Sequence, residues 1–196
     1  MLPPETILAA FPHSANVAIA LAPCKRVLRL EPMTLAHAIA LEAWGCDLGK
    51  ELDDAHALIA AWFLVKPASV LQEVMSDINT AGEEAQKWIR EKNKCVARIA
   101  TAVNRHIASA FGTFVPPASE SEQLYENSPR GYGWPLEVAE ALCGEYGWKF
   151  GDALATPVAT ALALVSVARQ RNGGKAGGPD YYERIQIAEM KKAGVA

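Results

Sequence analysis

Histidine and cysteine are the residues with which this chain could bind a metal ion or form a nucleophile. A zinc site needs several His, Cys or carboxylate ligands that converge, usually at close spacing in the sequence. The four histidines, none of which forms an i,i+4 pair, are His13, His37, His56 and His106. The four cysteines, which occur singly and without a C-x-x-C pair, are Cys24, Cys46, Cys95 and Cys143. The spacing predicts packed histidines, buried reduced thiols and no metal site. One alternative stays open: His37 and His56 could meet across a helical hairpin.

Other catalytic patterns are also weak. The acid pairs Asp53-Asp54 and Glu83-Glu84 could supply a hydrolase with an acid and a base, but both fall at predicted helix starts, where carboxylates compensate the helix dipole. The Gly-rich stretch around Lys175 lacks the Ser or Thr and the preceding strand of a phosphate-binding loop. No G-x-S-x-G nucleophile elbow occurs. We therefore expect a protein that is not an enzyme and uses no cofactor.

A run of cations follows one predicted helix over residues 83–111. Its members are Lys87, Arg90, Lys92, Lys94, Arg98 and Arg105, opposed by Glu91. On a helical wheel they lie opposite Trp88, Ile89 and Val103, as the solvated face of an amphipathic helix does. An acidic protein partner and nucleic acid remain as alternatives. The net charge of −3 and the sequence pI of about 5.8 make nucleic acid the less favoured partner.

Three aromatic residues stand at predicted helix edges beside Gly and Pro: Trp134, Tyr146 and Trp148. Large rings at such positions either pack against neighbouring elements or anchor a partner protein. We take these three residues as the candidate partner-binding site.

Helical patterns dominate the elements that would position these residues. Alternation of basic and aliphatic residues over 25–30 predicts a short strand or extended arm. Thr34 can cap a helix that runs to about Trp44, where Gly45 stops it. Asp53 or Asp54 can cap a helix over 55–65, and Ser69 with Gln72 suggests a capping box for a helix over 70–78.

The strongest periodicity predicts a single helix over 83–111, about 43 Å long at ~1.5 Å per residue. The Pro, Ser and Gly residues of 112–133 predict an interdomain linker. Helices are then expected over 136–144, over 157–171 with Thr156 as its N-cap, and over 181–192. The predicted fold is mainly α: a helical bundle with a short N-terminal strand or arm (1–111), the linker (112–133) and a smaller C-terminal helical part (134–196).

We expect no membrane span and a cytoplasmic location. Leu21-Ala22-Pro23-Cys24 loosely imitates a lipoprotein cleavage site, but residues 1–20 contain no Lys or Arg. The uncharged run over 153–168 contains Pro157 and is shorter than the ~20 residues that a bilayer requires.

Two segments carry a resemblance to a known family. The segment Leu28–Glu42, with its Leu-x-Pro-x-Thr-Leu pattern opening a helix that ends in Leu-Glu, resembles the N-terminal signature of small tail proteins of bacteriophages and prophages. Tyr146-Gly147-Trp148, Ala153-Leu154 and the helix end over 168–173 are similar to the C-terminal parts of phage tail assembly chaperones. Together the similar stretches cover about half of the chain.

The resemblance implies a helical, non-enzymatic protein of the bacterial host cytoplasm that binds and shields another tail protein, typically the tape-measure protein. Self-association is also possible. Two other functions remain open: a structural component of the virion, in the tail or connector, and a nucleic-acid-binding regulator that uses the basic face of the helix over 83–111.

Overall fold

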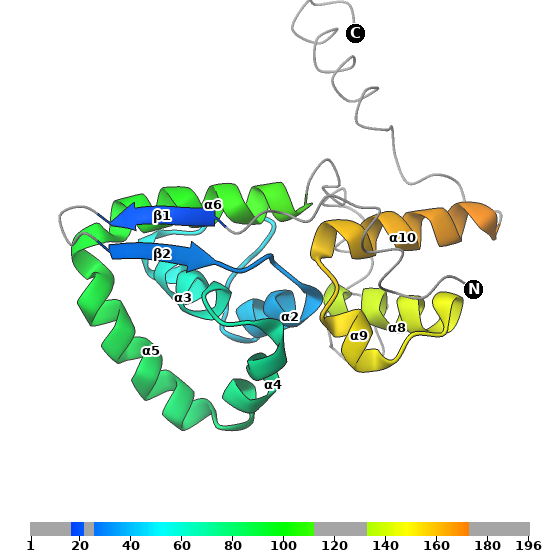
Figure 1. Ribbon diagram of the computed structural model, residues 1–196, viewed down its shortest axis with the longest axis horizontal. Helices are drawn as coiled ribbons and strands as arrows, with labels where there is room; N and C mark the ends of the chain where they lie inside the picture. The colour runs from blue at the N-terminus through cyan, green and yellow to red at the C-terminus, as the bar shows by residue number, and fades with distance from the viewer. Residues whose placement is uncertain (1–16, 22–25, 112–132, 173–196) are drawn as a thin grey trace, which may run out of the picture.

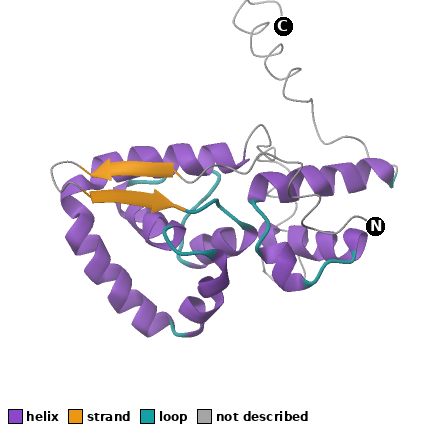
Figure 2. Ribbon diagram, in the orientation of Figure 1, coloured by secondary structure: helices purple, strands orange, loops and turns teal. Residues whose placement is uncertain are grey.

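The computed structural model describes residues 17–21, 26–111 and 133–172 and is mainly helical, with one small antiparallel sheet (Figures 1 and 2). The predicted fold class is confirmed. The first elements are β1 (Val17–Leu21), β2 (Arg26–Leu30), α2 (Leu35–Ala43), α3 (Asp54–Leu64) and α4 (Ala68–Ser76). They are followed by α5 (Ile78–Lys92), the 3-10 turn η1 (Asn93–Cys95), α6 (Val96–Phe111), α8 (Trp134–Tyr146), α9 (Phe150–Leu154) and α10 (Val158–Arg171).

The two strands form a hairpin in which Val17 pairs with Leu30 and Leu21 with Arg26. Leu28 and Leu30 point into the core, whereas Val27 and Arg29 are exposed, which is the period-two alternation of a half-buried strand. The strand predicted over 25–30 is therefore present. Its partner β1 was not predicted, because the surrounding prolines obscure a short apolar run.

Local capping chemistry sets the start of several helices. Thr34 caps α2 and Asp53 caps α3, each accepting a hydrogen bond from a backbone N–H of the first turn, as predicted. Gly45 follows the end of α2 with a φ of 80°, a left-handed conformation that suits glycine. The capping box proposed at Ser69 is wrong: α4 begins at Ala68, and its N-cap, Pro67, makes no side-chain cap.

The prediction of one unbroken helix over 83–111 is also wrong. Helix α5 begins earlier, at Ile78 with Asp77 as its cap, and the helical path is interrupted at η1 before α6 begins. A straight helix of that length would carry one half away from the rest of the chain. The interruption instead lets both α5 and α6 contact α3, and Figure 1 shows the two helices meeting at a corner.

The C-terminal helices follow the predicted order with shifted ends. Helix α8 runs two residues past its expected end and stops at Gly147, whose φ is 67°. Helix α10 begins at Val158 with Pro157 as its N-cap, so the predicted cap at Thr156 is wrong: the Thr156 hydroxyl donates to the Asp152 carbonyl. The linker predicted over 112–133, except Gly133, and the helix predicted over 181–192 lie outside the described residues.

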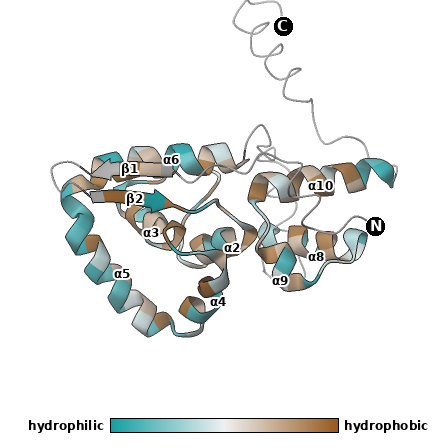
Figure 3. Cartoon of the chain, in the orientation of Figure 1, coloured by the Kyte–Doolittle hydropathy of each residue, from teal (hydrophilic) through white to brown (hydrophobic). Residues whose placement is uncertain are grey.

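One hydrophobic core joins the described residues of the two predicted parts. Its apolar members include Leu30, Met33, Leu35, Leu41, Phe63, Leu64, Ile99, Leu142 and Val158. Figure 3 shows α5 as mostly hydrophilic, in contrast to α3, which packs its apolar residues into this core. Helices from residues 134–171 thus lie directly on α2 and α6.

Among the described helices, none is long and apolar enough by itself to cross a membrane. The pair α3 and α4 passes that test together, by length and composition only, and the two are bent by 114°.

Candidate functional site

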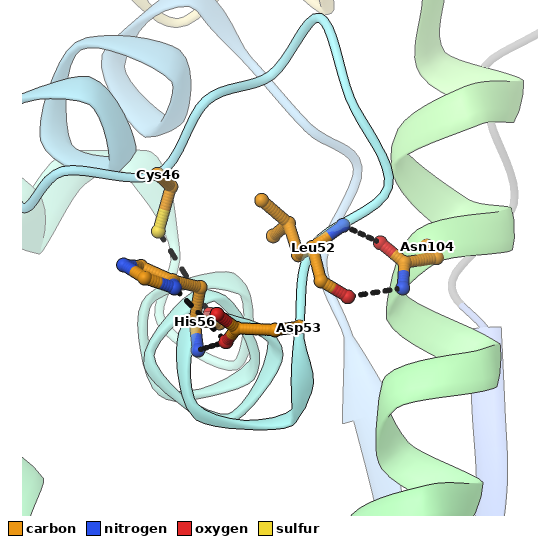
Figure 4. Close-up of polar contacts among 5 residues, drawn as sticks. All are labelled: Cys46, Leu52, Asp53, His56 and Asn104. Carbon is orange, nitrogen blue, oxygen red and sulfur yellow. Dashed lines mark hydrogen bonds and ion pairs between the residues drawn. The ribbon is translucent and has the colours of Figure 1, made fainter.

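Cys46, Asp53 and His56 meet at the loop between α2 and α3, and they are the residue types of a thiol nucleophile with its base and orienting acid (Figure 4). Oδ1 of Asp53 accepts the backbone N–H of His56 at 2.9 Å and lies 2.9 Å from Nδ1 of the same residue. The Cys46 thiol donates to the main-chain carbonyl of His56, with Sγ 3.8 Å from the oxygen. The imidazole ring and the thiol therefore have different partners.

The electrostatics of this corner oppose a nucleophile. Burial, assisted by the negative charge of Asp53, raises the pKa of Cys46 to about 11, so the thiol is protonated at neutral pH. A reactive cysteine needs the thiolate, which a neighbouring cation or helix N-terminus stabilises. Hydrogen bonds from the His56 backbone and ring lower the pKa of Asp53. As the structure places them, Asp53 and His56 act as the cap of α3.

Asn104 holds the same loop from the side of α6 (Figure 4). Its amide group donates to the Leu52 carbonyl and accepts the Leu52 N–H, both at 2.9 Å. Such a two-bond bracket fixes the backbone just before the cap of α3. Sequence reasoning missed Asn104; the only signal was a polar residue beside the core position Val103 in an amphipathic helix.

His37 is fully buried within α2. Its Nε2 lies 2.9 Å from the Lys66 carbonyl oxygen and its Nδ1 lies 2.8 Å from Oγ1 of Thr34. A carbonyl only accepts, so Nε2 carries the proton and Nδ1 accepts from the Thr34 hydroxyl and backbone N–H. Burial lowers the pKa of His37 to about 4. The ring is therefore neutral at physiological pH.

His106 is the second buried ring, on α6. Its Nε2 donates to the Glu31 carbonyl at 2.9 Å, and its Nδ1 has no hydrogen-bond partner among the described residues. Burial lowers the pKa of His106 as well, and the two histidines are close enough for His106 to depress the pKa of His37. From the sequence, His37 was considered only for a meeting with His56, and His106 only as a packed histidine.

The segment over residues 31–35 links several elements through its backbone. The Glu31 N–H donates at 2.6 Å to the carbonyl of Leu64, the last residue of α3. The Leu35 N–H donates to the Thr156 carbonyl at 3.1 Å, and the Val158 N–H donates to Met33 at 2.9 Å. Leu35 and Val158 are the first residues of α2 and α10, whose N–H groups have no acceptor inside their own helices. The chain just before each of these helices therefore provides the carbonyl that accepts the first N–H of the other helix.

The described residues contain no group of three or more His, Cys, Asp or Glu side chains that could hold a metal ion. His37 and His56, whose meeting across α2 and α3 the sequence left open, each bind a separate partner.

The three predicted partner-binding residues lie at the two ends of α8. Tyr146 and Trp148 are together, with ring centroids 5.9 Å apart, and the Tyr146 hydroxyl donates to the Leu164 carbonyl of α10 at 2.9 Å. Trp148 is only 6% exposed, and its Nε1 has no hydrogen-bond partner in the described part of the chain. Trp134 is half-buried against Phe111, with ring centroids 5.6 Å apart, about 18 Å from Tyr146 along the helix at ~1.5 Å per residue.

The predicted basic face is divided by the corner between α5 and α6. Lys87 and Arg90 are exposed on α5, and the Lys92 ammonium lies 5.9 Å from the centre of the Trp88 ring. The other three cations, Lys94, Arg98 and Arg105, belong to η1 and α6 and are exposed there.

A search for similar proteins found no family model, no curated protein and no solved structure that matches this chain.

Proposed function

We propose that this protein is a non-catalytic, protein-binding component of a phage or prophage tail module, which acts as a tail assembly chaperone that shields the tape-measure protein. The proposal starts from the resemblance of two segments, Leu28–Glu42 and the stretch over 146–173, to small phage tail proteins. It requires a helical protein with a surface that can hold an apolar segment of its partner.

The observation that carries the proposal is that the two segments of resemblance contact each other. They are far apart in the sequence, yet Leu35 and Met33 of the first are hydrogen-bonded to Thr156 and Val158, which lie between Ala153-Leu154 and the helix end of the second. Their contact supports the view that both belong to one structural unit.

The C-terminal segment also offers a surface suited to the task. Phe150, the first residue of α9, is 46% exposed and follows Trp148 and Lys149 directly. An exposed aromatic ring beside a packed aromatic pair is the kind of residue that dominates protein interfaces. In this proposal Phe150 contacts the partner, while Tyr146 and Trp148 pack together at the turn that precedes it.

Co-expression of the protein with the proteins encoded by its neighbouring genes, the proposed tape-measure protein among them, followed by pull-down, tests the proposal. We expect the wild-type protein to retain the tape-measure protein and Phe150→Ala to lower the retained amount about tenfold, as loss of an aromatic hot spot does. Val27→Ala is the matched control, because Val27 is 61% exposed on β2 and lies outside the C-terminal segment.

Failure of the wild-type protein to retain any neighbouring tail protein would remove the proposal. If Phe150→Ala and Val27→Ala lowered the retained amount equally, Phe150 would not be the partner-binding residue, although the protein would still bind the tape-measure protein. Purified particles provide a separate criterion: a chaperone is absent from them, whereas a structural tail or connector component is present at a fixed copy number.

A further inference from the structure

The outer face of α6 and the turn before it carry three exposed cations. Arg98 and Arg105 are seven residues apart on α6, a spacing that brings side chains to one side of a helix, and Lys94 lies in the preceding turn η1. We name these three residues the basic stripe. Helix α6 itself, Val96–Phe111, contains no Asp or Glu. The stripe therefore has no compensating charge on its own helix.

The basic stripe is unpaired within the described residues. The ion pairs found there join Lys50 to Asp47 and His56 to Asp53, and none involves the stripe. The exposed residues that lie between and beside the three cations on the same face are small: Ala97, Thr101 and Ala108. Small residues between long cationic side chains allow a second helix to approach closely.

A complementary surface exists on the C-terminal helices of the same chain. Helix α8 contains Glu137, Glu140 and Glu145 but no Lys or Arg. Glu140 and Asp152 of α9 are exposed, and both raise the pKa of Cys143, in addition to its burial, so the two carboxylates lie near the same thiol. We name Glu140 and Asp152 the acidic face. Lys149, also exposed, is the nearest cation to it in the sequence.

The basic stripe and the acidic face form no ion pair with each other in the described part of the chain. The end of α6 meets the start of α8, where Phe111 packs on Trp134, and Glu140 lies six residues further along α8. Both groups of side chains are exposed to solvent. Opposite charges on separate surfaces of one chain favour a contact between copies in which each copy uses a different surface.

We propose that the basic stripe of one copy docks against the acidic face of a second copy, in a head-to-tail contact. Because both surfaces remain available at the ends of a dimer, the contact builds rings or short chains of molecules. Exposed ion pairs contribute little individually, and two short helices bury less than the ~1,200 Å² of a stable interface. The association is therefore transient, dependent on concentration and sensitive to salt.

A second copy fits the stripe better than nucleic acid does. Three cations would neutralise few phosphates, and the net charge of −3 opposes a polyanion. The small residues between the cations also provide no aromatic ring on which a base could stack.

Sedimentation velocity across a range of protein concentrations tests this inference. We expect the sedimentation coefficient of the wild-type protein to rise with concentration at about 20 mM salt and to become constant at about 500 mM, where the Debye length is only a few Å. The double variant Arg98→Glu/Arg105→Glu should weaken the association at least tenfold. Glu140→Lys/Asp152→Lys should do the same.

A mixture of these two double variants is the decisive sample. Reversal of charge on both surfaces restores opposite charges between the variants, so the equimolar mixture should associate although neither variant does so alone. Lys87→Glu/Arg90→Glu is the matched control: it changes the net charge equally but lies on α5, and it should associate within about twofold of the wild type. Circular dichroism at each step confirms that the variants fold.

Three results would overturn the inference. One is a wild-type protein that stays monomeric at low salt, and another is a mixture that fails to associate. A third is a control variant that loses as much association as the stripe variant, since net charge alone would then explain the effect.

A 20-base-pair DNA duplex, added as a probe, tests the alternative. If the wild-type protein bound the duplex without self-association, and the stripe variant did not bind it, the stripe would be assigned to nucleic acid. The inference does not depend on the tail-assembly role, so either can fail alone.

Discussion

His37 and His106 are buried rings that bind backbone carbonyls belonging to other elements. His37 donates to Lys66, just past the end of α3, and His106 donates to Glu31, just past the end of β2. Each bond needs a proton on Nε2, which the neutral ring already supplies, and a second proton on Nδ1 would add a charge in a buried site. The pKa of each histidine is therefore lowered in the folded state.

The lowered pKa values predict that acid destabilises the protein well above the range where carboxylates titrate. Below pH ~6.5 the unfolded chain binds protons that folded His37, with a pKa of about 4, does not bind. The free energy of unfolding should be constant between pH ~7 and ~8 and fall between pH 6.5 and 4. His37 alone accounts for a loss of about 2 kcal/mol at pH 5, and His106 adds to it with the same sign. Urea denaturation at pH 7.5, 6 and 5 measures this loss.

His106→Gln is the informative variant for that experiment. The Gln amide can still donate toward the Glu31 carbonyl but does not titrate, so stability at pH 7.5 falls while the slope below pH 6.5 becomes smaller. A wild-type protein equally stable at pH 7.5 and pH 5 would show that the two rings titrate normally.

The distance along the chain between hydrogen-bonding partners decides which residue roles could be predicted. Thr34 and Asp53 bond within three residues, so their capping roles followed from the local sequence. His37, Asn104 and His106 bond to backbone groups 29, 52 and 75 residues away. Those pairings exist only after helices pack, and no local pattern indicates them.

At the scale of elements, the ends of α2 and α8 depend on glycine for one backbone conformation. Gly45 has a φ of 80° and open space where a Cβ would be added, while Gly144 lies inside α8 with equally open space. Gly45→Ala should lower the free energy of unfolding by about 1 kcal/mol, because an L-residue is strained at that φ. Gly144→Ala should raise it by about 0.5 kcal/mol through higher helix propensity.

Thermal or urea denaturation of the two variants beside the wild type checks these opposite signs. Since neither added methyl group meets another atom, the backbone angle is the main difference between the two sites. Two substitutions that changed stability in the same direction would contradict the assigned conformations.

The corner between α5 and α6 shows why element boundaries were harder to predict than element types. The apolar spacing of Trp88, Val96 and Val103 continues through Asn93–Cys95, so the sequence shows no breaker such as Pro or Gly there. The interruption is set by packing, because both helices contact α3 and Cys95 is buried at the turn. Tertiary contacts override helix propensity at this point.

At the scale of the molecule, the shared core links the predicted N-terminal and C-terminal parts. Met33 and Leu35 are fully buried and hydrogen-bonded to the start of α10. We expect the fragment 1–111 alone to be less stable than the full chain by about 3 kcal/mol or more, since its α2 would expose apolar area and lose two backbone partners. Urea denaturation followed by circular dichroism compares the two.

Addition of the fragment 133–196 should restore part of that stability. A fragment 1–111 that unfolds cooperatively with the full-length free energy would instead establish two independent domains. The sequence could not decide between these outcomes, because the composition of 112–133 suggests separation while the contacts that join the parts are non-local.

The pairing of Met33 with Val158 also determines when during synthesis the fold can be completed. At about 5 to 20 residues per second, roughly 6 to 25 s separate the synthesis of these two residues on the ribosome. Throughout that interval the first N–H group of α2 lacks its acceptor, the Thr156 carbonyl, and the apolar side chains that α10 will cover remain open to water. A nascent chain of this protein therefore has a period of exposure to proteases and to neighbouring nascent chains that ends only when α10 emerges.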